Sequence, residues 1–453
     1  MWTKLRLRNF KAYEDSGEVE LTPLTILIGP NSGGKSSILK ALLVLRQTAE
    51  CRDVKVPLHT DGPYCSLGEY GDFVFKGDKT SQVSFELAWE LPDEARARRY
   101  RIQRRVIVRG KSRLTAEVTP TPTSFHVTWG LRRGRLVVNH LAYGYRDDTV
   151  LIRLNRLTGG AYVPESVTVP VSWRPPKSRA YAPERFFQLP AELLLNASAQ
   201  DEHPSWTLWP RLQEAQAALE QQISATWYVG PLRYDPRRTY QVSAERPSDV
   251  GLKGERTVDA LYVAKRDARA STDSLKEWVQ RIGLADDIDL ERLKASFHSL
   301  VVADRLGYRA NVVDAGFGVS QLFPILMEAF YAPPYSTILL EQPEIHLNPR
   351  IQAGLGDVFV DLVLNAHKQF IIETHSEHLI SRIRTAIAKG QIAAGDVSVY
   401  YCSLEENAGR VLRLPITELG EFEQWPEGFF EDEVREAFAR TQAVFESKGA
   451  ATR

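Results

Sequence analysis

The sequence predicts an α/β fold built on a parallel sheet, because three short apolar runs, at residues 26–28, 336–341 and 369–373, each lead directly into polar residues. Such runs are typical of strands buried on both faces, and their carboxyl ends form the edge where parallel sheets bind ligands. Residues 81–175 instead alternate apolar and polar side chains between Gly and Pro, which predicts an inserted antiparallel β subdomain. Residues 256–300 have the apolar spacing of helices and predict a helical lobe.

The first apolar run continues into a phosphate-binding pattern. Residues 29–36 read Gly-Pro-Asn-Ser-Gly-Gly-Lys-Ser and precede an apolar helix start. Glycines permit close approaches that a Cβ would obstruct, so successive N–H groups and the helix N-terminus can converge on phosphate oxygens. In this pattern Lys35 reaches the β- and γ-phosphates of ATP, and Ser36 binds Mg²⁺. A glycine turn without a ligand, the plain structural alternative, needs neither the lysine nor the serine. The predicted nucleotide-binding residues are Gly29, Pro30, Asn31, Ser32, Gly33, Gly34, Lys35, Ser36 and Ser37.

The other two runs bring polar groups to the same edge of the sheet. Glu341 ends the second strand and is predicted to be a Mg²⁺ ligand together with Ser36. Gln342 and Glu344 follow it, and His375 follows the third strand, where it can hydrogen-bond a γ-phosphate or the attacking water. The candidate catalytic residues are therefore Gln342, Glu344 and His375. The alternative is that His375 is a structural residue whose hydrogen bonds are all made within the protein.

A fourth block, residues 314–321, places glycines before another helix. Gly318, Val319 and Ser320 offer backbone N–H donors at the N-terminus of that helix, which favours anions. A site that used both helices would engage the γ-phosphate from opposite sides. The alternative is a loop that only caps a core helix.

In this order and spacing, the four blocks resemble the ATP-binding-cassette (ABC) ATPases of the chromosome-maintenance and recombination-repair type, and more closely the OLD-like ATPases of bacteria. The resemblance covers residues 1–80 and 225–405 and implies the head of an ABC-type P-loop NTPase with ATP and Mg²⁺ as ligands. It identifies residues 346–349 as the D-loop and His375 as the switch histidine. The signature residues that act in trans on the ATP of a partner subunit are, by the same resemblance, Gly318, Val319, Ser320 and Gln321.

Three positions depart from that family pattern. The signature reads Gly-Val-Ser-Gln where transporters carry Leu-Ser-Gly-Gly-Gln, and the second strand ends in Glu341-Gln342 where the wider family has Asp-Glu. A neutral amide cannot accept the proton of the attacking water, so hydrolysis is expected to be slow unless Glu344 takes that role. Because residue 342 directly follows the metal carboxylate, we expect Gln342→Glu to raise the rate of ATP hydrolysis. If Glu344 is the base instead, Glu344→Gln should abolish hydrolysis. No glutamine occupies a clear Q-loop position, and Gln47 is expected on a helix surface.

The motifs divide the chain into four predicted regions. Residues 1–80 and 226–405 form the two parts of the ATPase domain, residues 81–225 a β-rich basic insertion, and residues 406–453 a C-terminal tail domain. The insertion holds fifteen Lys and Arg against three Asp and Glu between residues 95 and 160, although the whole chain has 57 of each sign. Such a patch attracts a phosphate backbone or an acidic partner, unless it is a solvated strand face. The tail resembles the ending of a bacterial subfamily whose C-terminal domain has no assigned function.

These observations lead to expectations about location and role. Three scattered cysteines indicate reduced thiols in a cytoplasmic protein, and the absence of an 18-residue apolar run argues against a membrane span. OLD-like nucleases carry a metal-dependent Toprim nuclease after the switch histidine, which needs a glutamate and an Asp-x-Asp pair. No Asp-x-Asp pair follows His375, so this resemblance implies that the chain lacks its own nuclease. The resemblance implies an ATP-dependent dimerising switch or sensor, in bacterial anti-phage defence, that controls a separately encoded effector such as a nuclease or a toxin. The alternatives are a DNA repair or recombination ATPase acting on nucleic acid, and a nucleotide-binding scaffold with little hydrolysis.

Overall fold

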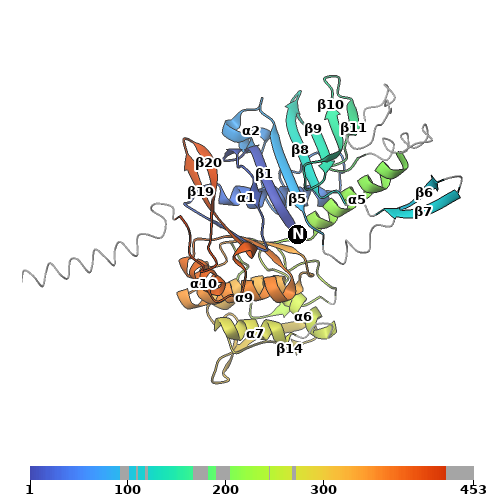
Figure 1. Ribbon diagram of the computed structural model, residues 1–453. Helices are drawn as coiled ribbons and strands as arrows, with labels where there is room; N and C mark the ends of the chain where they lie inside the picture. The colour runs from blue at the N-terminus through green and yellow to red at the C-terminus, as the bar shows by residue number, and fades with distance from the viewer. Residues whose placement is uncertain are drawn as a thin grey trace, which may run out of the picture.

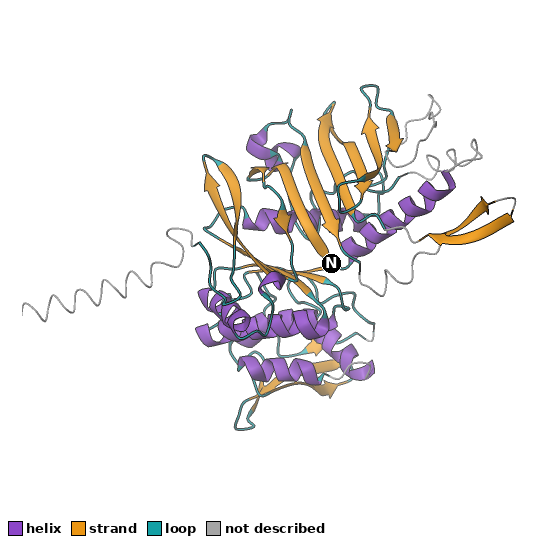
Figure 2. Ribbon diagram, in the orientation of Figure 1, coloured by secondary structure: helices purple, strands orange, loops and turns teal. Residues whose placement is uncertain are grey.

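The computed structural model describes residues 1–91, 102–108, 111–117, 121–166, 182–189, 205–243, 245–267 and 272–424. Two sheets dominate the molecule, and helix α1 (Lys35–Glu50) lies between them (Figure 1). Further helices and a small sheet cover the opposite face of the parallel sheet, as the purple and orange layers of Figure 2 show. No helix in the described part of the chain is both long and apolar enough to cross a membrane.

The parallel sheet confirms the strands predicted from the three apolar runs. In spatial order it consists of β12 (Thr226–Val229), β17 (Thr337–Glu341), β18 (Gln369–Glu373), β4 (Leu24–Ile28), β19 (Val397–Glu405) and β20 (Ala408–Leu414). Its first five strands run parallel, and β20 turns back antiparallel to β19. The register pairs Glu341 with Glu373 and Glu373 with Leu27. The ends of three strands therefore deliver their following residues to one edge.

The antiparallel sheet includes strands from the start of the chain as well as strands from the predicted insertion. Its strands are β1 (Trp2–Phe10), β2 (Tyr13–Asp15), β3 (Val19–Glu20), β5 (Val83–Trp89), β8 (Ser124–Arg132), β9 (Arg135–Gly144), β10 (Val150–Arg156) and β11 (Tyr162–Ser166). Because β5 pairs with β1, the later strands extend a sheet that starts at the beginning of the chain. One face packs fully buried aromatic rings such as Trp2, Phe85 and Trp129 toward α1 and α5 (Ser205–Ser224). Strands β6 (Ile102–Val108) and β7 (Lys111–Glu117) form a separate hairpin.

The helical lobe is only partly helical. Helices α6 (Thr257–Asp267) and α7 (Asp273–Ile282) occupy the first half of the region predicted as helix. The second half is wrong as a helix: β14 (Asp287–Lys294) and β15 (Phe297–Ala303) form a hairpin, which pairs with β13 (Tyr240–Gln241) and β16 (Arg309–Asn311). Residues 287–290 alternate polar and apolar side chains, which favours a strand, and pairing with distant segments adds information that a local pattern does not contain.

The remaining helices pack against the parallel sheet and against this lobe. They are α8 (Phe317–Tyr331), α9 (Pro349–Ala366) and α10 (Glu377–Ala388), with a single short turn α2 (Tyr70–Phe73) near the antiparallel sheet. Short 3₁₀ turns lie at Phe75–Gly77 and Ala394–Asp396. Helices α8 to α10 share one apolar core with the strands of the parallel sheet, which fixes the start of α8 relative to the sheet edge.

Candidate functional site

The glycine loop between β4 and α1 packs directly on strand β19. Gly29 has φ 131°, and a Cβ built on it would lie 2.1 Å from the backbone oxygen of Cys402; at Gly33 the same distance is 2.4 Å. Gly34 has φ 99°, and its Cβ would lie 2.7 Å from the hydroxyl of Tyr13. All three positions demand glycine for space, and the positive φ of Gly29 and Gly34 demands it for backbone conformation as well. Pro30, Asn31 and Ser32 form the exposed tip of the loop.

Lys35 lies inside this loop. Its side chain is 3% exposed, and Nζ donates hydrogen bonds to the backbone oxygens of Gly29 at 2.9 Å and Pro30 at 2.8 Å. The ammonium also lies 4.0 Å from Oε1 of Glu373. Burial lowers the pKa of Lys35, while Glu373 opposes that shift. The glycine loop therefore wraps around the ammonium group of Lys35.

Glu373 is a site residue that the sequence analysis missed. The Ser36 hydroxyl donates a hydrogen bond of 2.7 Å to its Oε2, and its strand partner in the register is Glu341. Burial raises the pKa of Glu373, and the neighbouring Glu341 adds to that rise. Glu341 itself accepts a hydrogen bond of 2.8 Å from the hydroxyl of Tyr228. The available signal was that residues 337–341 and 369–373 are parallel strands of equal length, so their last carboxylates align.

These oxygen groups are suitable ligands for Mg²⁺. Mg²⁺ prefers oxygen and is commonly bound through one or two carboxylates together with substrate phosphates. The structure brings together the predicted ligand Ser36 and the carboxylate Glu373, with Glu341 on the adjacent strand. Among the described residues, no group of three or more His, Cys, Asp or Glu side chains could hold a metal without such a phosphate.

Glu344 and His375 lie against each other at the same edge. The backbone N–H of His375 donates to Glu344 Oε1 at 2.7 Å, whereas Glu344 Oε2 and His375 Nε2 are buried without a hydrogen-bond partner in the described structure. Glu344 is 9% exposed, and burial raises its pKa. Burial, with a contribution from Lys35, lowers the pKa of His375. Gln342 has φ 45° and donates its backbone N–H to the oxygen of Glu373, so the chain turns sharply between Glu341 and Glu344.

A cavity of about 430 Å³ opens beside the glycine loop. Its walls include Ser32 to Ser37, Lys11, Lys76, Asp72 and Glu373. This volume lies in the range of small-ligand sites, and two lysines at its rim suit an anionic ligand. Among its described lining residues, none belongs to α8.

The predicted signature residues lie in the first turn of α8. Gly316 precedes the helix with φ 85°, and Gly318 is half-buried. Val319 packs in the apolar core beneath the sheet, and Ser320 and Gln321 are also buried. The side chains thus anchor the helix, and the backbone N–H groups of its first turn remain the groups suited to bind an anion.

The expectation that Gln47 is a surface residue is wrong. Gln47 is 1% exposed, its Oε1 accepts from the backbone N–H of Cys65 at 3.1 Å, and its Nε2 donates to the backbone oxygens of Cys65 and His59. The side chain fastens the segment after α1 to the helix. Helical spacing alone does not reveal a loop that folds back over the helix.

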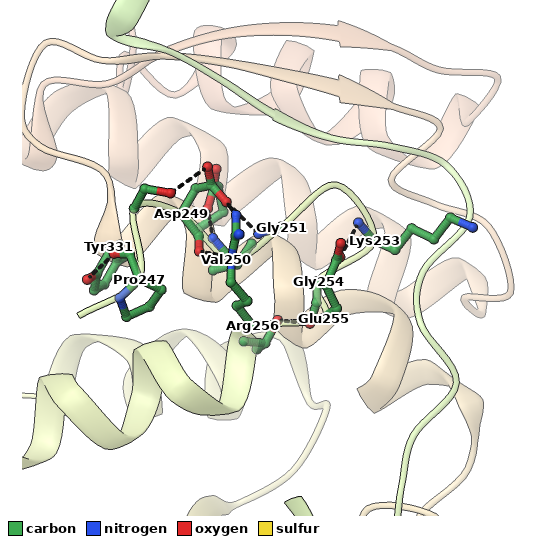
Figure 3. A network of polar contacts seen from close by, with 12 residues as sticks. Pro247, Asp249, Val250, Gly251, Lys253, Gly254, Glu255, Arg256 and Tyr331 are labelled. Atoms are coloured by element: carbon green, nitrogen blue, oxygen red, sulfur yellow. Dashed lines mark hydrogen bonds and ion pairs between the residues drawn. The ribbon is translucent and has the colours of Figure 1, made fainter. Parts of the chain in front are cut away.

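A loop at residues 246–256 contacts helix α1, the segment that follows β12, and helix α8. Asp249 pairs with Arg256, and its Oδ1 accepts from the backbone N–H of Gly251 (Figure 3). Asp249 also lies 3.6 Å from a guanidinium nitrogen of Arg46 on α1. The hydroxyl of Tyr331 on α8 donates to the oxygen of Pro247 at 2.7 Å (Figure 3). This network fixes the loop against two helices.

The same loop reaches the buried part of α8 and is braced internally. The backbone N–H of Val250 donates to Oε2 of the buried Glu328 at 3.0 Å. The backbone N–H of Lys253 donates to Glu255 at 2.8 Å (Figure 3). The loop therefore has little freedom to move independently of α8.

The basic stretch is only partly visible in the described structure. Residues 92–101, 109–110 and 118–120 lie outside the described residues, as do the side chains of β6 and β7. The described arginines Arg132, Arg133 and Arg135 are exposed at the turn between β8 and β9. The β8–β9 turn therefore forms an exposed basic surface at the end of these two strands.

Comparisons with known proteins agree with this architecture. Residues 1–86 match the family described as "AAA ATPase domain", residues 198–381 the family described as "AAA domain, putative AbiEii toxin, Type IV TA system", and residues 392–439 a "Protein of unknown function (DUF3696)". No curated protein matches the chain.

Solved structures of SMC heads are also similar to the chain. The SMC head domain from Thermotoga maritima is 11% identical with a TM-score of 0.41, covering 92% of this chain and 99% of that one. An SmcHead bound to the C-winged helix domain of ScpA is 13% identical with a TM-score of 0.45, covering 92% and 98%. An Smc head with an extended coiled coil, bound to the C-terminal domain of ScpA derived from Pyrococcus furiosus, is 11% identical with a TM-score of 0.42, covering 91% and 96%.

The two AAA matches fall on the halves that the fold brings together, one carrying Lys35 and the other Glu341 and His375. Both parts of the nucleotide site thus lie in segments that match AAA ATPase-domain families, and the C-terminal segment matches a family of unknown function.

Proposed function

We propose that two copies of the chain associate head to tail and that ATP is the ligand that joins them. Each ATP would be bound by residues 29–36 of one copy and by residues 318–321 of the other. The observation that carries this proposal is the composition of the glycine-loop cavity, whose described lining includes no residue of α8. The first turn of α8, whose backbone N–H groups suit an anion, would then be available to the ATP bound by a second copy.

Within one copy, the described side chains suit slow ATP hydrolysis. Lys35 would exchange its bonds to the Gly29 and Pro30 oxygens for phosphate oxygens. Ser36, Glu341 and Glu373 would hold Mg²⁺, which neutralises phosphate charge when it is bound. Glu344 would accept the proton of the attacking water at its unpartnered Oε2.

His375 and Gln342 would assist that step without taking a proton. His375 Nε2 is buried without a partner and can donate to the γ-phosphate. Gln342 can orient the water through its amide but cannot act as a base. The rate of ATP hydrolysis is expected to be modest, because the carboxylate of Glu344 lies three residues after Glu341 and not directly after it.

The biological role that we propose is an ATP-gated switch in anti-phage defence, acting through a separately encoded effector. The description of the family matched by residues 198–381, which names a toxin of a toxin–antitoxin system, supports this direction. The second candidate is an ATPase that acts on nucleic acid in repair or recombination. The exposed arginines at residues 132–135 favour that candidate, because clustered guanidinium groups attract a phosphate backbone.

Trans-complementation tests the proposed arrangement. Lys35→Ala removes the cation of the glycine loop, and Gly318→Asp adds a repelling charge at the start of α8, where a Cβ has ordinary contacts only, at 3.7 Å or more. Each variant alone should hydrolyse no ATP, whereas a mixture should regain activity because one composite site in a mixed dimer is intact. No recovery in the mixture, with both variants folded, would show that α8 does not act in trans.

ATPase rates measured with and without DNA separate the two candidate roles. Stimulation by DNA that disappears when Arg132, Arg133 and Arg135 are changed to Gln would favour the nucleic-acid role. A rate that DNA leaves unchanged, with stable ATP-bound dimers, would favour the switch.

A further inference from the structure

Arg233 is a buried cation whose donors are mostly unused. It follows β12 in the segment Gly230–Tyr234 and is 8% exposed. One nitrogen, Nη1, donates to the backbone oxygen of Pro231 at 2.7 Å, and Nε and Nη2 are buried without any hydrogen-bond partner in the described structure. Buried guanidinium groups without partners are costly, so native proteins rarely keep them unless a ligand uses them.

Arg233 lies just beyond the C-terminal end of β12, which pairs in parallel with β17 so that Val229 is opposite Leu340, the residue before Glu341. Arg233 is therefore at the same sheet edge as the candidate site. Its charge interacts with the Tyr228 hydroxyl and with the carboxylates Glu344 and Glu341, in that order of strength. Burial lowers the pKa of Arg233 to about 10, which leaves it charged at neutral pH. Glu344 also has an unpartnered oxygen, yet no hydrogen bond joins it to Arg233. A cation with unpaired N–H donors and a carboxylate with an unpaired oxygen thus lie at the same sheet edge with no hydrogen bond between them.

The backbone on both sides of Arg233 is held by the loop shown in Figure 3. The N–H of Gly230 donates to the oxygen of Leu252, and the N–H of Tyr234 donates to the oxygen of Lys253, each at 2.8 Å. That loop is in turn tied to α8 through the contact of Pro247 with Tyr331 (Figure 3) and through the hydrogen bond from Val250 to Glu328. The guanidinium is therefore presented from a rigid support, as a ligand-binding group requires.

We propose that Arg233 is a ligand of the terminal phosphate of ATP, donating through Nε and Nη2 to two phosphate oxygens. The planar guanidinium matches this geometry better than an ammonium group does. The contact would lie in the same copy as Lys35, and it would connect the terminal phosphate to α8 through the loop at residues 246–256. This inference rests on the proposed ATP site and adds a residue that distinguishes ATP from ADP.

Equilibrium binding of ATP and ADP in the presence of Mg²⁺ tests the proposal. Arg233→Gln should weaken ATP binding about 10- to 100-fold, the range for charge-assisted hydrogen bonds, and leave ADP binding nearly unchanged. Arg233→Lys should fall between the two because it keeps the charge but loses the paired donors. Arg237→Gln, which changes an exposed arginine shortly after that segment, is the matched control and should bind both nucleotides like the wild type.

The outcomes distinguish this inference from the ATP site itself. Equal losses of ATP and ADP affinity, with a lower unfolding temperature, would overturn the inference and make Arg233 a structural residue. Unchanged ATP and ADP affinities in Arg233→Gln would also overturn it, while the loss of binding in Lys35→Ala would leave the ATP site standing. If Arg233→Gln does not fold, the ATP-to-ADP affinity ratio of Arg233→Lys decides, and a wild-type ratio overturns the inference. A wild-type chain that bound no ATP would refute the proposed function.

Discussion

Glu344 allows the sharpest test of the hydrolytic site, through the change Glu344→Gln. The glutamine oxygen can still accept the backbone N–H of His375, which Glu344 Oε1 accepts at 2.7 Å, so the local structure should persist. The change removes the free oxygen that would accept a proton from water. General-base assistance is worth about 10²- to 10⁴-fold, so the barrier should rise by about 3–5 kcal/mol, with ATP affinity unchanged.

The pH dependence of the wild type provides an independent readout. Glu344 acts as a base only when it is ionised, and burial raises its pKa above the ordinary carboxyl value of 4.5. The hydrolysis rate of the wild type should therefore fall as the pH drops through that raised pKa. The residual rate of Glu344→Gln should lack this acid limb.

Single-turnover hydrolysis of labelled ATP, with binding measured separately, is the assay. Gln342→Glu is the reciprocal variant: if residue 342 positions the water, this change raises turnover and Glu344→Gln matters little. A wild-type single-turnover rate in Glu344→Gln would refute the assignment of the base. No change in either variant would show that the catalytic water lies elsewhere.

Three other changes test the surroundings of the site. Gly29→Ala should destabilise the fold by about 1–3 kcal/mol in chemical denaturation, because its Cβ would lie 2.1 Å from the Cys402 oxygen; wild-type stability would contradict the packing. Burial raises the pKa of Glu328 from 4.5 to about 7, so between these pH values the folded state binds more protons than the unfolded state. The free energy of unfolding should therefore fall by up to about 3 kcal/mol as the pH rises from 4.5 to 7. Thermal unfolding of Glu328→Gln should lack this fall, and an identical pH profile would refute it. Glu373→Gln should raise the Mg²⁺ concentration needed for ATP binding by about 10- to 100-fold, because Ser36 loses its charged acceptor; an unchanged Mg²⁺ titration would remove Glu373 from the metal site.

The parts of the site that could be predicted are those encoded in contiguous residues. The glycine loop and the three buried strands are local patterns, and they fold as expected. Glu373 was missed because its role depends on the register between two strands, and Arg233 was missed because nothing in a single arginine reveals burial without a partner. Gln47 was misplaced since a loop from later in the chain covers it. Each of these depends on long-range packing, which a local pattern does not specify.

The packing of the glycine loop on β19 changes how the C-terminal family of unknown function should be regarded. Strand β19 lies within residues 392–439, and its Cys402 oxygen forms the floor beneath Gly29 and Gly33. The hairpin that follows is fastened to the start of the chain, since the N–H of Gly409 donates to the oxygen of Ala12 at 2.6 Å. At least the first part of this segment is therefore not a detachable appendage. A chain cut before residue 392 would lose two strands of its central sheet, β19 and β20, together with the support of its nucleotide loop, so domain dissection would damage the site that it was meant to isolate.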